Sequence, residues 1–261
     1  MNVFTAIILG IVQGLTEFLP VSSSGHLVLF QKILGVSGDM LFFDTLLHLG
    51  TLVAVVAVLW NEIVAIFKNI FGKTTWLLVI ATIPAGIASL LLEDLIEEAF
   101  GGSYLGVGFL LTSLFLILAE QLFMRRKRKK TEIGYVDALG MGLMQAVAIF
   151  PGISRSGATL SAGLALGVER ETATHFSFLM TIPVILGSTL LQGYKVIKEG
   201  AEQIAIFPTI IGVLFAAAAG FFAVKWMLKL IATKKLYGFA IYTAVLGIII
   251  LADQLFLHLI F

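Results

Sequence analysis

The sequence QGLTEFLPVSSSGH at residues 13–26 interrupts an apolar stretch that covers residues 3–36. A second polar sequence, PGISRSGAT at residues 151–159, interrupts residues 135–168 in the same way. Only a short helical piece remains on each side of either break, whereas a helix needs about 20 apolar residues to cross a bilayer. Each stretch is therefore predicted to form a re-entrant helical hairpin, which is tolerated at membrane depth only where protein or a wet cavity covers its backbone.

The two breaks belong to an internal repeat. A shift of 132 residues, which carries Ala6 onto Ala138, also superimposes the two Ser-x-Ser-Gly segments. The same shift aligns the Leu-Gly-Val triplets at residues 34–36 and 166–168, and chance matches of common apolar residues would not keep one register in this way. The chain is therefore predicted to be a single membrane domain, 1–261, that divides into a first repeat at 1–124, a linker at 125–133 and a second repeat at 134–261.

The composition indicates that lipid is the solvent of this chain. Hydrophobic residues make up 59% of the 261 residues and charged residues only 13%, compared with roughly 25% charged residues in soluble domains. There is no cysteine, which excludes disulfides and thiolate metal sites. The predicted fold is an all-α polytopic membrane protein with the two hairpins and six transmembrane helices, at residues 40–66, 75–93, 104–124, 172–195, 205–228 and 236–258. Three crossings in each half would invert the second repeat relative to the first.

Lysine and arginine gather in three of the predicted loops, which the span count places on one side of the membrane. The positive-inside rule makes that side cytoplasmic, so both termini are expected outside the cytoplasm. The run RRKRKK is interpreted as a topology signal rather than a nucleic-acid patch, and no nucleic-acid partner is expected. The basic positions concerned are Lys68, Lys73, residues 125–130, Lys225, Lys229, Lys234 and Lys235.

Ionisable groups in the two breaks are site candidates, because each costs roughly 2.5–3.5 kcal/mol at the centre of a membrane helix. The first break contains Glu17 and His26, and Gln13 precedes Glu17 by one helical turn. The second break contains Arg155 in a glycine-rich turn that leads into a helix N-terminus, where free N–H groups and the helix dipole favour an anion. The pattern predicts a phosphate cradle that faces a general base, a metal ligand, or both.

Structural explanations stand beside this interpretation. The serines and glycines of the breaks could serve only to satisfy backbone groups and to let helices pack closely. Glu17 and Arg155 could form a buried ion pair with no further role. Asp44 and His48, one turn apart in the first predicted span, are interpreted as a buried polar pair rather than as part of the site.

Residues 13–26 resemble the first signature of the bacterial undecaprenyl-diphosphate phosphatases of the bacitracin-resistance (BacA/UppP) family, which is (E/Q)-x-x-x-E followed by a serine-rich turn and histidine. Residues 151–159 are similar to the second signature, P-G-x-S-R-S-x-x-T, at every fixed position. The resemblance covers essentially the whole chain, including the duplication. Gln13 stands where many members have glutamate, and the signature allows either residue.

The resemblance implies hydrolysis of a C55 polyprenyl diphosphate lipid to the monophosphate, which recycles the carrier for cell-wall synthesis and confers bacitracin resistance. It also implies a bacterial inner-membrane location, with a site open to the outer face. A transporter or flippase for an anionic or prenyl-phosphate lipid is the alternative, because inverted repeats with broken helices are common in transporters. The sequence leaves the oligomeric state open, with a homodimer as one alternative.

The resemblance also implies roles for single residues. Arg155 would bind the diphosphate, and Glu17 with Gln13 would hold Mg²⁺ or Ca²⁺ or activate a nucleophile. The nucleophile would be Ser23, activated by His26, or a water molecule. The further substrate contacts expected are Ser22, Ser24, Gly152, Ser154, Ser156, Gly157 and Thr159.

Overall fold

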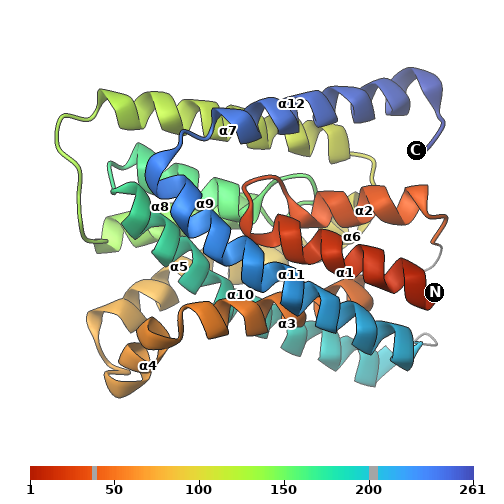
Figure 1. The fold of residues 1–261 in the computed structure, drawn as a ribbon, viewed down its shortest axis with the longest axis horizontal. Coiled ribbons are helices and arrows are strands. Elements are labelled where there is room, and N and C mark those ends of the chain that lie inside the picture. The colour runs from red at the N-terminus through yellow and green to blue at the C-terminus, as the bar shows by residue number, and fades with distance from the viewer. Residues whose placement is uncertain (37–39, 200–204) are drawn as a thin grey trace.

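The structure, a computed structural model, describes residues 1–36, 40–199 and 205–261 (Figure 1). Within these three segments every regular element is a helix, and the only β-type pairing is a single bridge between Lys130 and Val168. The helices are α1 (Val3–Phe18), α2 (Ser23–Ile33), α3 (Leu41–Val58), α4 (Trp60–Lys68), α5 (Lys73–Leu91), α6 (Glu93–Phe100), α7 (Leu105–Arg125), α8 (Tyr135–Val147), α9 (Arg155–Ala165), α10 (Arg170–Glu199), α11 (Ile206–Thr233), α12 (Tyr237–Ala252) and a π-helical turn, Asp253–Leu257.

Six helices in the described part of the chain are long and apolar enough to cross a membrane. They are α3, α5 and α7 in the first half, and α10, α11 and α12 with its π-helical extension in the second half. The predicted all-α polytopic fold with six spans is thus confirmed. The helices α1, α2, α8 and α9 contain 16, 11, 13 and 11 residues, fewer than the roughly 20 that a bilayer requires, as expected for hairpin helices.

The two hairpins enter from opposite ends of the molecule, and their tips meet in the middle. In Figure 1 the open end of α1–α2 lies at the right beside both chain termini, and that of α8–α9 lies at the left beside the α7–α8 connection. At the tips, Ser156 Oγ donates a hydrogen bond of 2.9 Å to the carbonyl oxygen of Leu19. Gly25 packs so closely that a Cβ there would lie 3.0 Å from the Cα of Gly152. This arrangement agrees with two re-entrant hairpins of opposite orientation.

The halves are interlocked because the first helix of each one packs on a span of the other. Helix α1 packs along α11, and its repeat counterpart α8 packs along α5. Small residues allow both contacts, since a Cβ on Gly10 would lie 2.3 Å from the carbonyl oxygen of Gly212, and one on Gly142 would lie 2.5 Å from that of Ala81. Gly10 and Gly142 are equivalent in the repeat, so one approximate two-fold relation describes both contacts.

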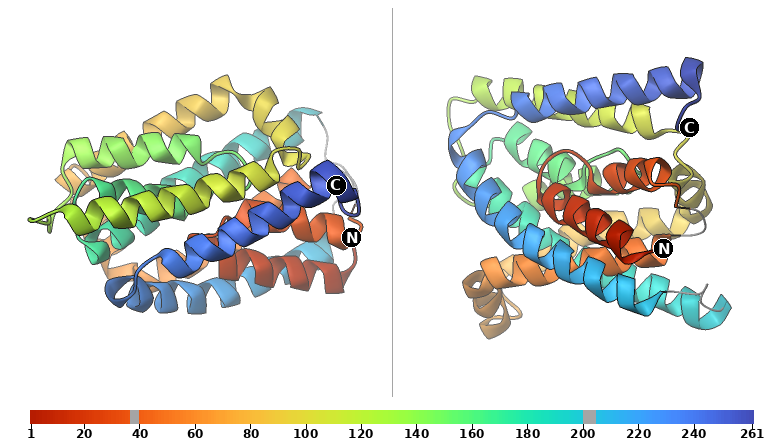
Figure 2. Two further views of the ribbon diagram at one scale, coloured as in Figure 1. Left: turned by 90° about the horizontal axis from the view of Figure 1, so that it is seen from above. Right: turned by 45° about the vertical axis from the view of Figure 1, so that its right-hand side comes forward.

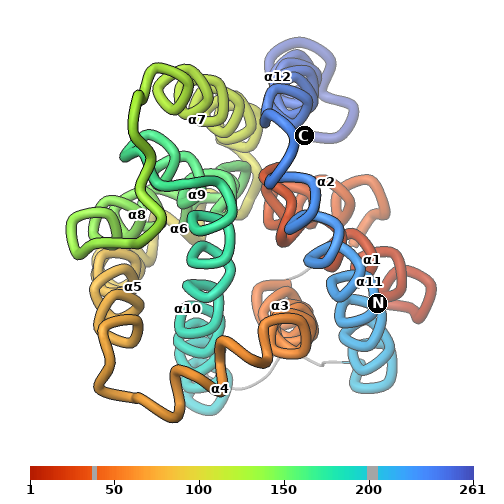
Figure 3. Tube along the Cα trace, turned by 60° about the vertical axis from the view of Figure 1, so that its left-hand side comes forward, coloured from red at the N-terminus to blue at the C-terminus, as the bar shows by residue number. Residues whose placement is uncertain are grey.

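Helix α9 is the most enclosed of the four hairpin helices. It packs against α7, α8 and α10, and nine consecutive residues from Ser156 to Leu164 are buried. Seen nearly along the helix axes in Figure 3, α9 lies inside a surrounding set of helices, and Figure 2 shows α7 and α12 crossing one face of the molecule side by side. Protein therefore covers the polar second break, as a re-entrant backbone requires.

One predicted boundary is wrong. The span predicted at residues 40–66 ends at Val58, and α4 follows as a separate helix after Leu59. The polar Asn61 and Glu62 stand at the start of α4, and Glu62 pairs with His175 of α10 at 3.4 Å, which explains the early end of the span. The acidic segment that follows the second predicted span forms the short helix α6.

The basic loops lie together, as the span count predicted. Figure 1 places α4, the α7–α8 connection and the α11–α12 connection at one end of the molecule and both termini at the other. We call these the basic end and the terminal end.

Candidate active site

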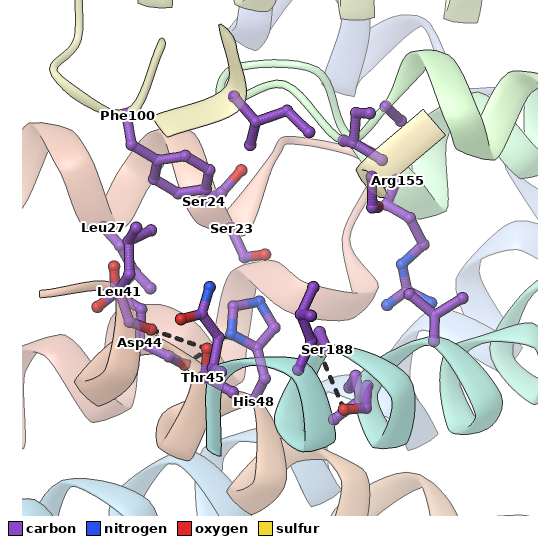
Figure 4. Close-up of a pocket in the computed structure, with 18 of the residues that line it drawn as sticks. Ser23, Ser24, Leu27, Leu41, Asp44, Thr45, His48, Phe100, Arg155 and Ser188 are labelled. Atoms are coloured by element: carbon purple, nitrogen blue, oxygen red, sulfur yellow. Dashed lines mark hydrogen bonds between the residues drawn. The ribbon is translucent and has the colours of Figure 1, made fainter. Parts of the chain in front are cut away.

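A cavity of about 250 Å³ begins where the hairpin tips meet and extends to the terminal end (Figure 4). We call it the central cavity. Glu17, Ser23 and Arg155 line it at the hairpin tips. Lys195 of α10 lines the opposite end, where it forms ion pairs with two acidic residues of α6, Glu93 and Glu97. The cavity thus joins the polar centre of the fold to the terminal end.

Glu17 is the centre of the polar network. It is 5% exposed, and its Oε1 forms an ion pair with Arg155. Its Oε2 accepts hydrogen bonds from Ser23 Oγ at 2.5 Å and from Gln13 Nε2 at 3.0 Å, and His48 Nε2 lies 3.4 Å from the same oxygen. The ion pair considered as a purely structural alternative therefore exists, but it borders a cavity, and the other carboxylate oxygen accepts a hydrogen bond from a serine hydroxyl.

Two helices begin at the wall of the central cavity. Helix α2 starts at Ser23 and α9 starts at Arg155, and both of these residues line the cavity. Ser22 and Ser154, which are equivalent in the repeat, cap the two helices by accepting a backbone N–H of the first turn. The positive ends of two helix dipoles therefore point to one place, which favours binding of an anion there.

The other predicted substrate contacts in the second break lie behind the cavity wall. They are Gly152, Ser154, Ser156, Gly157 and Thr159, none of which lines the central cavity. Ser156 bonds to Leu19, and Thr159 Oγ1 lies 2.6 Å from Ser177 Oγ of α10. In this structure these hydroxyls hold the hairpin in place, and contact with substrate stays a prediction for them. In the first break, Ser24 lines the cavity and Ser22 does not.

The expected contact between His26 and Ser23 is not formed. His26 Nδ1 lies 2.7 Å from the carbonyl oxygen of Ser22, and Nε2 lies 2.7 Å from the hydroxyl of Tyr242 on α12. A carbonyl can only accept, so Nδ1 carries the proton, and Nε2 of the neutral ring accepts a hydrogen bond from the Tyr242 hydroxyl. Side chains on a helix lean toward its N-terminus, which brings the ring of His26 onto the preceding turn. Ser23 donates to Glu17 instead.

His48 of α3 belongs to the site, although the sequence interpretation left it out. Its ring lies at the cavity wall (Figure 4), where Nδ1 donates to the backbone oxygen of Asp44 at 2.7 Å and Nε2 lies 3.4 Å from Glu17 Oε2. The Asp44 carboxylate accepts a hydrogen bond from Gln31 Nε2 rather than from His48. A signal was available, because Asp44, Thr45 and His48 form one polar face on an otherwise apolar span, and all three line the cavity.

The oxygen atoms near Glu17 fit a hard divalent cation. Gln13 Oε1 is buried beside Glu17 and has no hydrogen-bond partner in the described structure. No group of three or more Asp, Glu or His residues that could hold a metal is found in the part of the chain that the structure describes. Mg²⁺ is commonly held by one or two protein ligands together with substrate phosphates, so a carboxylate and an amide oxygen beside an anion site suit that mode of binding.

The fold and the site define a class of protein: a multi-pass membrane protein with a polar centre where two duplicated helical hairpins meet. Residues 6–249 match the family of the bacitracin resistance protein BacA, and the chain belongs to that family. The resemblance drawn from the two motifs is confirmed by this match.

Curated relatives match over nearly the whole chain. A protein of Carboxydothermus hydrogenoformans named undecaprenyl-diphosphatase is 45% identical over 258 residues, which is 97% of this chain and 98% of that protein. Proteins with the same name from Halothermothrix orenii and Parabacteroides distasonis are 43% and 40% identical. These alignments cover 96% and 98% of this chain and 98% and 99% of the relatives.

Proposed function

We propose that this protein is an undecaprenyl-diphosphatase, which hydrolyses undecaprenyl diphosphate to undecaprenyl phosphate and inorganic phosphate. The released monophosphate returns the lipid carrier to cell-wall synthesis. One observation carries the proposal beyond the family match: the hydroxyl of Ser23 donates to the buried carboxylate of Glu17 beside the guanidinium of Arg155. A nucleophile, a base and an anion-binding group thus share one cavity.

Arg155 and the two helix N-termini receive the diphosphate head group. A guanidinium forms bidentate hydrogen bonds with phosphate oxygens, so the diphosphate competes with Glu17 for Arg155. When Arg155 turns to the phosphate, the Glu17 carboxylate loses its positive partner and becomes a better proton acceptor. Substrate binding therefore makes the Glu17 carboxylate available as the general base.

Ser23 Oγ then attacks the terminal phosphorus while Glu17 Oε2 accepts its proton. The bond from that phosphorus to the bridging oxygen breaks, and undecaprenyl phosphate leaves. A water molecule then attacks the phosphoserine, the bond from phosphorus to Ser23 Oγ breaks as Glu17 returns the proton to that oxygen, and inorganic phosphate is released. Arg155 neutralises the negative charge that develops on the phosphoryl oxygens.

In the alternative role, Glu17 would be a metal ligand rather than the base, and it would hold Mg²⁺ or Ca²⁺ with Gln13 Oε1 and the diphosphate. Such an ion would neutralise phosphate charge. The buried, unpartnered Gln13 Oε1 supports this assignment. Chelation of divalent cations is expected to stop phosphate release, and release that continues in excess chelator would remove the ion from the proposal.

We further propose that the protein lies in the bacterial cytoplasmic membrane with its terminal end on the outer face. The positive-inside rule assigns the basic end to the cytoplasm, and the central cavity reaches the opposite end at Lys195, Glu93 and Glu97. A polar head group that approaches from the outer leaflet would meet the cavity directly.

Adjacent serines provide a matched test of the nucleophile. Ser23 and Ser24 both line the cavity, but Ser23 is the one that bonds to Glu17. Ser23→Ala is expected to reduce phosphate release from undecaprenyl diphosphate by about a thousandfold or more, and Ser24→Ala by less than about tenfold. Substantial turnover by Ser23→Ala would exclude Ser23 as nucleophile and favour a water molecule.

A further inference from the structure

A second cavity, of about 270 Å³, lies beside the central cavity on the other side of α6. We call it the apolar groove. Hydrocarbon side chains of α6, α7 and the second hairpin tip form its walls, and a tyrosine hydroxyl is the one side-chain polar group among its lining residues. The residues that matter here are Leu95, Tyr104, Val107, Leu111, Phe150 and Ile153.

Helix α6 is the wall between the two cavities. Leu95 and Ala99, one turn apart, line the apolar groove. The adjacent residues Ile96 and Phe100 line the central cavity. Ile153, in the loop just before Arg155, lines both, so the two cavities meet at the residue next to the catalytic region.

The far side of the apolar groove opens on the outside of the helix bundle. Val107 is 45% exposed and Tyr104 is 52% exposed, and both lie at the start of the membrane-spanning helix α7. The groove therefore offers an almost wholly apolar path from the hairpin tips to the outside of the helix bundle, whereas the central cavity, which leads from the same tips to the terminal end, carries charged residues among its apolar ones.

We propose that the apolar groove binds the isoprenoid chain of the substrate, with Ile153 as the junction where the chain leaves the diphosphate. This inference rests on the proposed function. A prenyl diphosphate has a charged head and a long hydrocarbon tail, and the cavity pair provides separate surroundings for each at one junction. Binding energy from the remote tail can be used to position the reacting phosphate, so a filled groove lowers turnover of long substrates in particular.

The test compares two substrates and two matched tryptophan variants. Val107→Trp fills the groove, and Leu114→Trp is its control, because Leu114 lies two turns further along α7, is 47% exposed and lines neither cavity. Val107→Trp is expected to lower kcat/KM for undecaprenyl diphosphate by about tenfold. The same variant is expected to leave kcat/KM for the five-carbon dimethylallyl diphosphate within about twofold of the wild-type value. Leu114→Trp is expected to change neither constant. Unchanged turnover of the short substrate also shows that the variant is folded. Equal losses for both substrates, or no loss for either, would overturn the proposal.

Photolabelling separates this inference from the proposed function. An undecaprenyl phosphate analogue with a diazirine near its phosphate is expected to label residues 104–111 of wild-type protein, and excess undecaprenyl phosphate is expected to displace it. Displacement by phosphatidylglycerol to the same degree would show a general lipid site and contradict the inference. Labelling can succeed even if the protein releases no phosphate, whereas failure of phosphate release from both substrates would count against the proposed function itself.

Discussion

Glu17 shows how much of the site a local pattern can reveal. The spacing of Gln13 and Glu17 predicts a shared helix face, and their side chains are hydrogen-bonded at 3.0 Å. The contact with Arg155 could not be derived from spacing, because 138 residues separate the two partners. His26 was assigned to Ser23 on proximity in sequence, and the direction of its side chain along α2 decides otherwise.

The role of His48 leads to a residue-scale prediction. His48→Ala removes the imidazole that faces Glu17 and is expected to lower kcat by about tenfold to a hundredfold, with a smaller change in KM, because the group acts on the base rather than on the substrate. Phosphate release from undecaprenyl diphosphate measures both constants.

His175→Ala is the matched control for that variant. His175 also lies 3.4 Å from a glutamate, Glu62, but outside the central cavity. It is expected to retain wild-type turnover. Equal impairment of the two histidine variants would mean that His48 acts on folding rather than on the reaction.

At the scale of elements, helix length was the most informative signal. Polar breaks flanked by short apolar pieces predict hairpins, and α1, α2, α8 and α9 have the expected lengths. Helices α4 and α6 could not be predicted in the same way. Each has fewer than ten residues and forms ion pairs with a distant part of the chain, α4 with His175 and α6 with Lys195. A count of apolar residues along the sequence contains no information about such tertiary ion pairs.

At the scale of the whole molecule, the duplication produces the site and its asymmetry gives the site its chemistry. The repeat predicts that two hairpins meet, and each supplies one helix N-terminus to the cavity. The residues that occupy equivalent places differ, since Ile149 stands where the first repeat has Glu17. The packing of α1 on α11 and of α8 on α5 follows the same approximate two-fold relation between the halves. The sequence contains no direct sign that the first helix of each half packs on a span of the other half.

Orientation is a property of the whole molecule and has its own test. Three spans in each half and basic loops at one end predict that a reporter fused after Phe261 is active outside the cytoplasm. A reporter inserted in the basic linker at residues 125–133 is expected to be active inside. A cytoplasmic C-terminus would contradict the proposed orientation and the access of the central cavity to the outer face.

The central claim is that the hairpin junction hydrolyses a lipid diphosphate rather than transporting one. Purified protein in detergent, where no gradient exists, provides the most direct measurement: phosphate release from undecaprenyl diphosphate with Mg²⁺ or Ca²⁺ supplied. We predict release by the wild-type protein and by Glu62→Gln, a carboxylate variant outside the cavity, and no measurable release by Glu17→Gln or Arg155→Ala. A wild-type protein that releases no phosphate, or a Glu17→Gln variant that releases it at the wild-type rate, would contradict the claim.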